Sequence, residues 1–81
     1  MSYYVQYTDL AERGLSGLST ADRATIKRQI ENTIGRDPYG HGSSPIHGNK
    51  ERRSASLSSA VFEYEVSASV LTITVLRAVP W

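Results

Sequence analysis

The residues best suited to chemistry in this chain are three cations that stand close together, Lys50, Arg52 and Arg53. Ammonium and guanidinium groups form charge-assisted hydrogen bonds with phosphate oxygens, and arginine can form two such bonds in parallel. If these residues begin a strand, Arg52 and Arg53 point to opposite faces, so only one of them can face a shared groove. The alternative interpretation is an exposed, charged strand start that discourages pairing between sheet edges.

Two histidines, His41 and His47, lie in a glycine-rich segment just before that cluster. Imidazole takes up and releases protons near neutral pH, so this pair can serve as general base and general acid in phosphodiester cleavage. Loop histidines six residues apart are more commonly only solvated, and a structural metal site normally needs four ligands. We therefore expect no metal and no cofactor.

Glu63 and Glu65 occupy alternate positions of a predicted strand and so share one face. Strand geometry puts their Cβ atoms about 7 Å apart, which suits a paired acid and base. The alternative, which we favour, is a solvated polar face.

The composition sets the limits for these hypotheses. The chain has 81 residues, which predicts a single domain over residues 1–81 with a small core. Its formal net charge of +1 gives no overall case for nucleic-acid binding. Residues 23–53, however, carry seven basic side chains against three acidic ones and form the only basic region.

Nothing in the sequence predicts a signal peptide, a membrane-spanning segment or an oxidising compartment. The chain contains no cysteine, so disulfides and thiolate metal sites are excluded. Its first four residues have no basic or apolar run, and the apolar stretch over residues 70–79 is interrupted by Thr72, Thr74 and Arg77. We expect a cytoplasmic protein without a small-molecule substrate.

The first half of the chain predicts one strand and two helices. Alternation over residues 3–7 indicates a strand, and Asp9 followed by Glu12 resembles a capping box that starts a short helix. Ser19 and Asp22 repeat this pattern before a second helix. That helix carries an isoleucine every fourth residue, and Gly35 is expected to supply a left-handed cap at its end.

The second half predicts a loop over residues 35–50 and then three strands, over residues 53–57, 61–66 and 70–79. Turns are expected at Ser58-Ser59 and at residues 67–69. The fold class is therefore α+β in the order β-α-α-β-β-β, with a helical hairpin on one face of a four-stranded antiparallel sheet. The expected core is Leu15, Leu18, Ile26, Ile30, Ile34, Phe62, Tyr64, Val66, Leu71, Ile73 and Val75.

This order of elements, with its landmarks, resembles the RelE/ParE superfamily of bacterial toxins. The landmarks are the opening strand Tyr4-Val5-Gln6-Tyr7-Thr8, the two helices, the segment Arg36-Asp37-Pro38-Tyr39-Gly40, the loop Pro45-Ile46-His47-Gly48, and the strand Phe62-Glu63-Tyr64-Glu65-Val66 with its partner Leu71-Thr72-Ile73-Thr74-Val75. The last pair is similar to the family's Tyr-Glu-Val strand. No single motif is specific, but the ordered set covers nearly the whole chain.

The resemblance implies a toxin of a type II toxin–antitoxin pair that is held inactive by a cognate antitoxin. RelE-type members cut mRNA on the ribosome without a metal, through lysine and arginine on the concave sheet face. There the ribose 2′-OH attacks the adjacent phosphate while cations stabilise the transition state. On this resemblance, Lys50, Arg52 and Arg53 are the expected catalytic residues.

Two departures from the family pattern favour functions other than mRNA cleavage. Three residues before the tyrosine of the Tyr-Glu-Val strand, RelE-type members usually have arginine, whereas this chain has Val61. The last strand reads Ala78-Val79-Pro80-Trp81 and stops, where family members usually continue through a basic segment. The alternatives are therefore a ParE-like inhibitor of DNA gyrase, or a decayed toxin that only binds its antitoxin.

Overall fold

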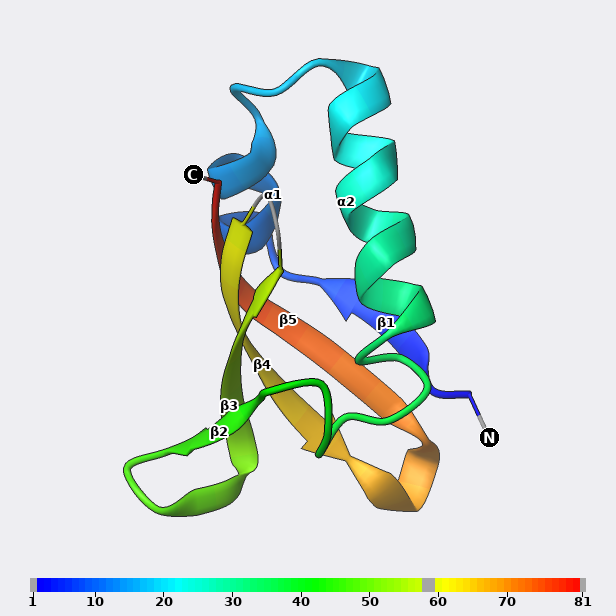
Figure 1. Cartoon of the computed structure of the whole chain (residues 1–81), viewed down its shortest axis with the longest axis vertical. Coiled ribbons are helices and arrows are strands. Elements are labelled where there is room, and N and C mark those ends of the chain that lie inside the picture. Colours follow the sequence, from blue (N-terminus) through cyan, green and yellow to red (C-terminus); the bar gives the residue numbers. More distant parts are fainter. Residues whose placement is uncertain (1, 58–59, 81) are drawn as a thin grey trace.

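The computed structural model describes residues 2–57 and 60–80 (Figure 1). The predicted turn at Ser58-Ser59 lies outside these residues. The elements, in chain order, are β1 (Tyr4–Tyr7), α1 (Asp9–Leu15), α2 (Thr20–Asn32), β2 (Ser44–Ile46), β3 (Asn49–Leu57), β4 (Ala60–Ser67), a 3-10 turn η1 (Ala68–Val70) and β5 (Thr72–Pro80).

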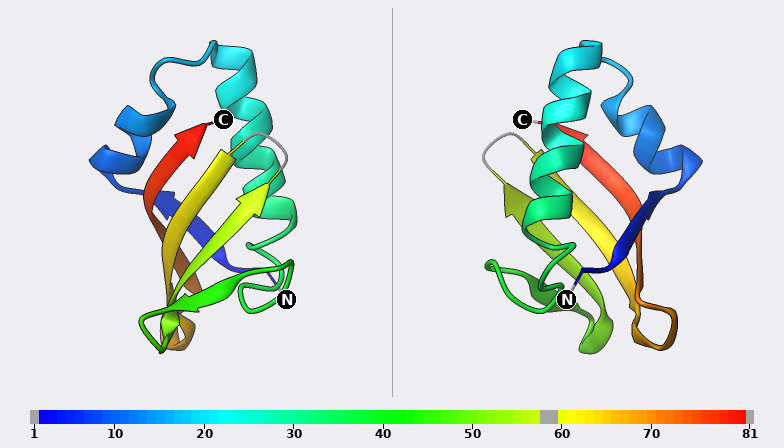
Figure 2. Two further views of the ribbon diagram at one scale, coloured as in Figure 1. Left: turned by 60° about the vertical axis from the view of Figure 1, so that its left-hand side comes forward. Right: turned by 90° about the vertical axis from the view of Figure 1, so that its right-hand side faces the viewer.

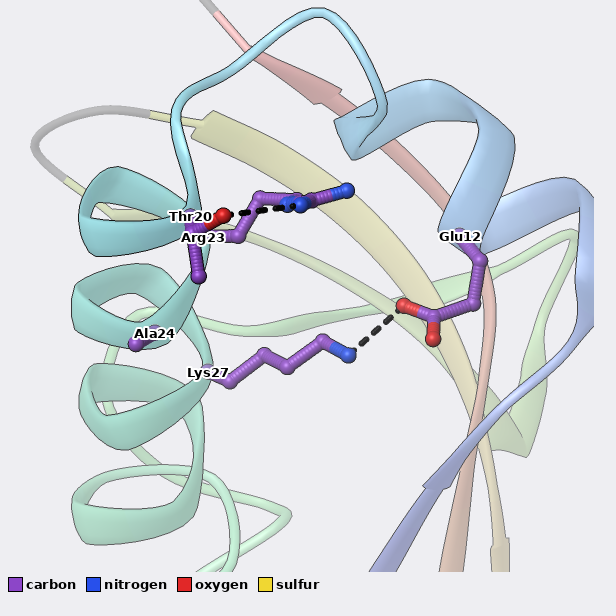
Figure 3. A pocket seen from close by; sticks show the side chains of 5 residues that line it. All are labelled: Glu12, Thr20, Arg23, Ala24 and Lys27. Carbon is purple, nitrogen blue, oxygen red and sulfur yellow. Dashed lines mark hydrogen bonds and ion pairs between the residues drawn. The ribbon is translucent and has the colours of Figure 1, made fainter.

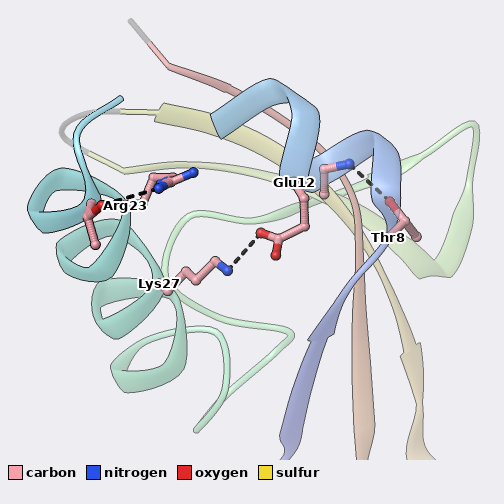
Figure 4. Close-up of polar contacts among 6 residues, drawn as sticks. Thr8, Glu12, Arg23 and Lys27 are labelled. Atoms are coloured by element: carbon pink, nitrogen blue, oxygen red, sulfur yellow. Dashed lines mark hydrogen bonds and ion pairs between the residues drawn. The ribbon is translucent and has the colours of Figure 1, made fainter. Parts of the chain in front are cut away.

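Both helices begin at a capping side chain. For α2 the cap is the predicted one, because the Asp22 N–H donates to the Ser19 hydroxyl at 3.1 Å. For α1 the prediction was wrong by one residue. The Thr8 hydroxyl, and not the Asp9 carboxylate, accepts from the Ala11 N–H, also at 3.1 Å (Figure 4). Asp9 then lies in the first turn, where its charge favours the helix dipole.

The end of α2 also differs from the prediction. Gly35 has no left-handed backbone, and Thr33 closes the helix through N–H bonds to the carbonyls of Gln29 and Ile30. Glycine is needed there for space, since a Cβ on Gly35 would lie 2.4 Å from the Glu31 carbonyl oxygen.

The sheet has five strands in the order β1-β5-β4-β3-β2, and β1 runs parallel to β5 (Figure 2). The prediction of four antiparallel strands is corrected in two respects. The short strand β2 forms inside the expected loop, and the N-terminal strand joins the sheet edge in parallel. The α+β class and the helices on one sheet face are confirmed. None of the described helices is long and apolar enough to cross a membrane.

One core lies between the helices and the sheet. It contains nine of the predicted residues, with Leu18 packed at its margin. Leu71 was wrongly predicted: its side chain is 40% exposed, and its backbone is left-handed with φ 49°. The chain needs this conformation to leave η1, so β5 starts at Thr72, two residues later than predicted.

Helix α1 lies very close to β5 at Gly14. A Cβ built on Gly14 would lie 1.9 Å from the backbone oxygen of Ala78, whereas one on Gly17 meets nothing within 4 Å. Contact with a backbone atom cannot be relieved by a side-chain rotation. Gly14 therefore sets the distance between α1 and the sheet.

We predict that Gly14→Ala destabilises the domain by about 1–3 kcal/mol, although alanine is the better helix former, because α1 must shift away from β5. Gly17→Ala is the matched control and should be neutral or slightly stabilising. Urea unfolding followed by circular dichroism measures both. Equal midpoints for the two variants would show that α1 does not approach β5 this closely.

Candidate functional site on the open sheet face

The face of the sheet opposite the helices carries the outward side chains of β4. Val61, Glu63 and Glu65 alternate with the buried Phe62 and Tyr64, as predicted from the sequence. Across the β3–β4 ladder, Arg52 lies opposite Glu65 and Ser54 lies opposite Glu63. The prediction that only one of the two neighbouring arginines shares this face is confirmed, and that one is Arg52.

A β-bulge adds a second arginine to the same face. Tyr64 pairs with Val75 but Glu63 pairs with Arg77, so Leu76 is an extra residue in β5. The bulge reverses the alternation, and Arg77 is exposed on the open face instead of pointing into the core. Sequence analysis missed this residue, because a regular continuation of Ile73 and Val75 would have buried it.

The open face is hollowed between β3, β4 and β5. The hollow has a volume of about 300 Å³ and brings together a cation, a carboxylate and an apolar wall. It is lined by Ser54, Val61, Phe62, Glu63, Arg77 and Val79. In such a hollow the guanidinium can donate to a phosphate, and the carboxylate beside it can accept a proton from a neighbouring hydroxyl.

Arg52 flanks this hollow and is held only weakly. Its Nη2 lies 3.4 Å from the Glu65 carboxylate, and the two side chains are 48% and 45% exposed. An ion pair this exposed contributes little to stability. Arg52 can therefore exchange Glu65 for a phosphate at small cost.

Arg53 has a different environment from the predicted one. Its side chain points to the opposite face of β3, where the residue is only 7% exposed. Its guanidinium donates to the Ser43 hydroxyl (3.0 Å), the Ser43 carbonyl (3.3 Å) and the Lys50 carbonyl (3.1 Å). Arg53 thus ties the segment before β2 to β3, and direct contact with a phosphate would require these bonds to break.

Tyr39 packs against the same guanidinium, and we call Arg53, Tyr39 and the groups they bind the anchor. Its ring lies 5.3 Å from the Arg53 Cζ and 5.5 Å from the Lys50 Nζ, which are cation–π distances. Its hydroxyl donates to the Glu51 carboxylate at 2.9 Å. Burial and this carboxylate raise the pKa of Tyr39 to about 12. Lys50, the third predicted cation, is exposed next to this anchor.

His41 and His47 lie in two separate turns at the two ends of β2, and both are exposed. In the part of the chain that the structure describes, no three His, Cys, Asp or Glu side chains gather as possible metal ligands.

A second hollow, of about 330 Å³, separates the two helices (Figure 3). Its cations are already engaged. Lys27 lies 2.7 Å from the Glu12 carboxylate and 4.6 Å from the Tyr7 ring centroid, and Arg23 donates to the Thr20 hydroxyl (Figures 3 and 4). The Lys27–Glu12 ion pair thus bridges α2 and α1 across this hollow, and its lining residues include no histidine.

The fold is shared with solved bacterial and archaeal proteins. A chain of the RelBE2 toxin–antitoxin complex from Mycobacterium tuberculosis matches with a TM-score of 0.80 at 20% identity, over 100% of both chains. The isolated RelE toxin from E. coli matches with a TM-score of 0.72 at 15% identity, over 98% of this chain and 84% of that one. A chain of the RelE–RelB complex from Pyrococcus horikoshii matches with a TM-score of 0.65 at 19% identity, over 99% and 96%.

Sequence comparison adds nothing to these structural matches. No family model matches the chain, and no curated protein matches it significantly. The predicted resemblance is therefore confirmed at the level of the fold, which is that of the RelE toxins.

We predict that Arg53→Ala destabilises the domain by about 2–3 kcal/mol, because charge-assisted bonds are lost and the Ser43 and Lys50 groups remain unpaired. Arg53→Lys should restore little of this, since an ammonium cannot reproduce the planar set of donors. Arg52→Ala is the control and should change the free energy of unfolding by less than about 0.5 kcal/mol. Equal urea midpoints for Arg53→Ala and Arg52→Ala would contradict the anchoring role.

The raised pKa of Tyr39 predicts an alkaline limit to stability. Its pKa in the fold is about 12 against an ordinary value of 10.0, so the stabilising contribution is complete below pH 10 and is lost between pH 10 and 12. Tyr39→Phe should flatten the fall of thermal midpoint over this interval, although its midpoint at pH 8 should be lower. Parallel pH profiles for the two proteins would contradict the prediction.

Proposed function

We propose that this protein is the toxin of a type II toxin–antitoxin pair and that it cuts mRNA on the ribosome. The observation that carries the proposal is the open face, where the bulge sets Arg77 opposite Glu63 and Arg52 flanks the same hollow. The fold supports it, since the similar structures include the RelBE2 complex of Mycobacterium tuberculosis and the RelE–RelB complex of Pyrococcus horikoshii. The proposed partners are a cognate antitoxin, the ribosome and mRNA.

The proposed chemistry uses side chains of the open face and a water molecule. The Glu63 carboxylate takes the proton of a ribose 2′-OH, and the 2′-oxygen then forms a bond to the adjacent phosphorus. The bond from phosphorus to the 5′-oxygen breaks, and that oxygen takes a proton from water. The hydroxide that remains takes back the proton held by Glu63, which regenerates the carboxylate and the water. Arg77 and Arg52 donate to the phosphate oxygens, where negative charge increases in the transition state.

The other predicted cations take supporting roles in this scheme. Lys50 is exposed next to the anchor and can contact the RNA backbone outside the hollow. Arg53 positions Lys50 and the segment before β2 through its three hydrogen bonds, and it touches no substrate.

A second candidate function, inhibition of DNA gyrase without chemistry, is favoured by one feature of the same face. Glu63 and Glu65 stand there together, and Val61 occupies the position where RelE-type toxins usually have arginine. Two carboxylates disfavour a polyanion unless nearby cations offset them. Arg52 and Arg77 are those cations, which is why we rank cleavage first.

Arg77→Gln tests the cleaving role directly. We expect a loss of at least about a hundredfold in the rate of mRNA cleavage on programmed ribosomes, with cut sites mapped by primer extension, because one transition-state contact is removed. Arg28→Gln, an exposed cation on α2, is the matched control and should cleave normally. Expression of the unmodified protein should arrest bacterial growth, and co-expression of its antitoxin should restore it.

Two outcomes would contradict the proposal. Intact mRNA with the unmodified protein, together with gyrase-dependent DNA damage in arrested cells, would establish the second candidate. Full cleavage by Arg77→Gln would show that the reaction does not use the hollow on the open face.

A further inference from the structure

Two histidine–glycine turns enclose β2, and neither has a part in the proposed chemistry. The first is the turn Gly40–Ser43, closed by a bond from the Ser43 N–H to the Gly40 carbonyl at 3.1 Å. The second is the two-residue turn His47-Gly48 that joins β2 to β3, with Ile46 paired to Asn49. We call residues 40–50 the His–Gly hairpin; its loop extends from the body of the molecule in Figures 1 and 2.

The backbone of both turns favours another residue at the histidine position. His41 and His47 have φ of 57° and 53°, and the glycines that follow them both have φ of 74°. A turn with two positive φ angles prefers Asn-Gly or Gly-Gly, because asparagine and glycine tolerate the left-handed region best. Both imidazoles are exposed, so they add nothing to the core. Histidine also tolerates the left-handed region, so the turns permit the two exposed imidazoles without requiring them.

The only formally charged side chain of the His–Gly hairpin is the Lys50 ammonium. Residues 40–50 include Lys50 and two histidines but no aspartate or glutamate. The nearest carboxylate in the following strand, Glu51, already accepts a hydrogen bond from the Tyr39 hydroxyl. The ring N–H groups are thus displayed to solvent without a competing acceptor from the hairpin's own side chains, while the Lys50 ammonium lies 5.5 Å from the Tyr39 ring centroid.

The hairpin is also held firmly at its base. Arg53 bonds to Ser43 at one end and to the Lys50 carbonyl at the other. Fixing the backbone at the base lowers the conformational entropy that the hairpin loses when it binds.

From these observations we infer that the His–Gly hairpin is a second RNA-binding surface, separate from the hollow on the open face, and that His41, His47 and Lys50 bind the phosphate backbone of structured RNA. The choice of RNA as the polyanion rests on the proposed function. The surface needs no particular base sequence, because phosphates carry no sequence information.

The test replaces both histidines by asparagine, His41→Asn with His47→Asn, which suits the turns better and removes the imidazoles. The probe is a short fluorescein-labelled RNA hairpin, and binding is followed by fluorescence anisotropy. We expect the double variant to bind at least about tenfold more weakly, since each imidazole contributes one hydrogen bond to a charged group. Its thermal midpoint should be equal to or higher than that of the parent protein.

Lys50→Gln in the same assay should lower the salt dependence of binding by about one counterion, and Arg28→Gln on α2 should leave it unchanged. Unchanged affinity of the double asparagine variant, or no binding of the probe by the parent protein, would overturn the inference. Hairpin-dependent binding by a protein that leaves ribosomal mRNA intact would instead reject the proposed function and retain this surface.

Discussion

The strict alternation of β4 is the constraint on which the rest of this structure depends. Every second residue of this strand is buried, and both neighbours are antiparallel to it. Shifting its register by one residue would bring Glu63 and Glu65 into the core and expose Phe62 and Tyr64. Burying two unpaired carboxylates costs far more than a small domain can spare. The position of the carboxylates on the open face is therefore set by the packing of the other face.

Two different structural features position the cations near these carboxylates: a bulge in β5 and regular alternation in β3. The bulge at Leu76 interrupts the alternation of β5 and turns Arg77 outward, while Val75 and Ala78 remain buried on either side. On β3 the alternation is regular, so Arg52 faces outward and Arg53 inward. The inward arginine lies next to Tyr64, whose hydroxyl donates to the Pro38 carbonyl, and both residues fasten the segment before β2. The anchor and the open face thus share strands but not side chains.

Sequence reasoning succeeded where apolar residues recur with a regular period along one buried face of an element. The isoleucine stripe of α2 and the alternation of β4 predicted their elements and most of the core. It failed where contacts between distant segments determine the strand pairing or the backbone conformation. Nothing local indicated that Tyr4–Tyr7 would pair with β5 in parallel, or that Leu71 would take a left-handed turn. The site was only half predicted: alternation put one of Arg52 and Arg53 on this face without saying which, and Arg77 depends on a bulge that appears only when β4 and β5 are aligned.

In the proposed reaction, the open face promotes attack of a ribose 2′-OH on the neighbouring phosphate. The chemical ends of mRNA recovered from ribosomes after incubation with the purified protein test this most directly, because the ends record which oxygen attacked. The account predicts a 2′,3′-cyclic phosphate on the upstream fragment and a 5′-hydroxyl on the downstream one. Fragments with a 3′-hydroxyl and a 5′-phosphate, or mRNA without any cut, would contradict it.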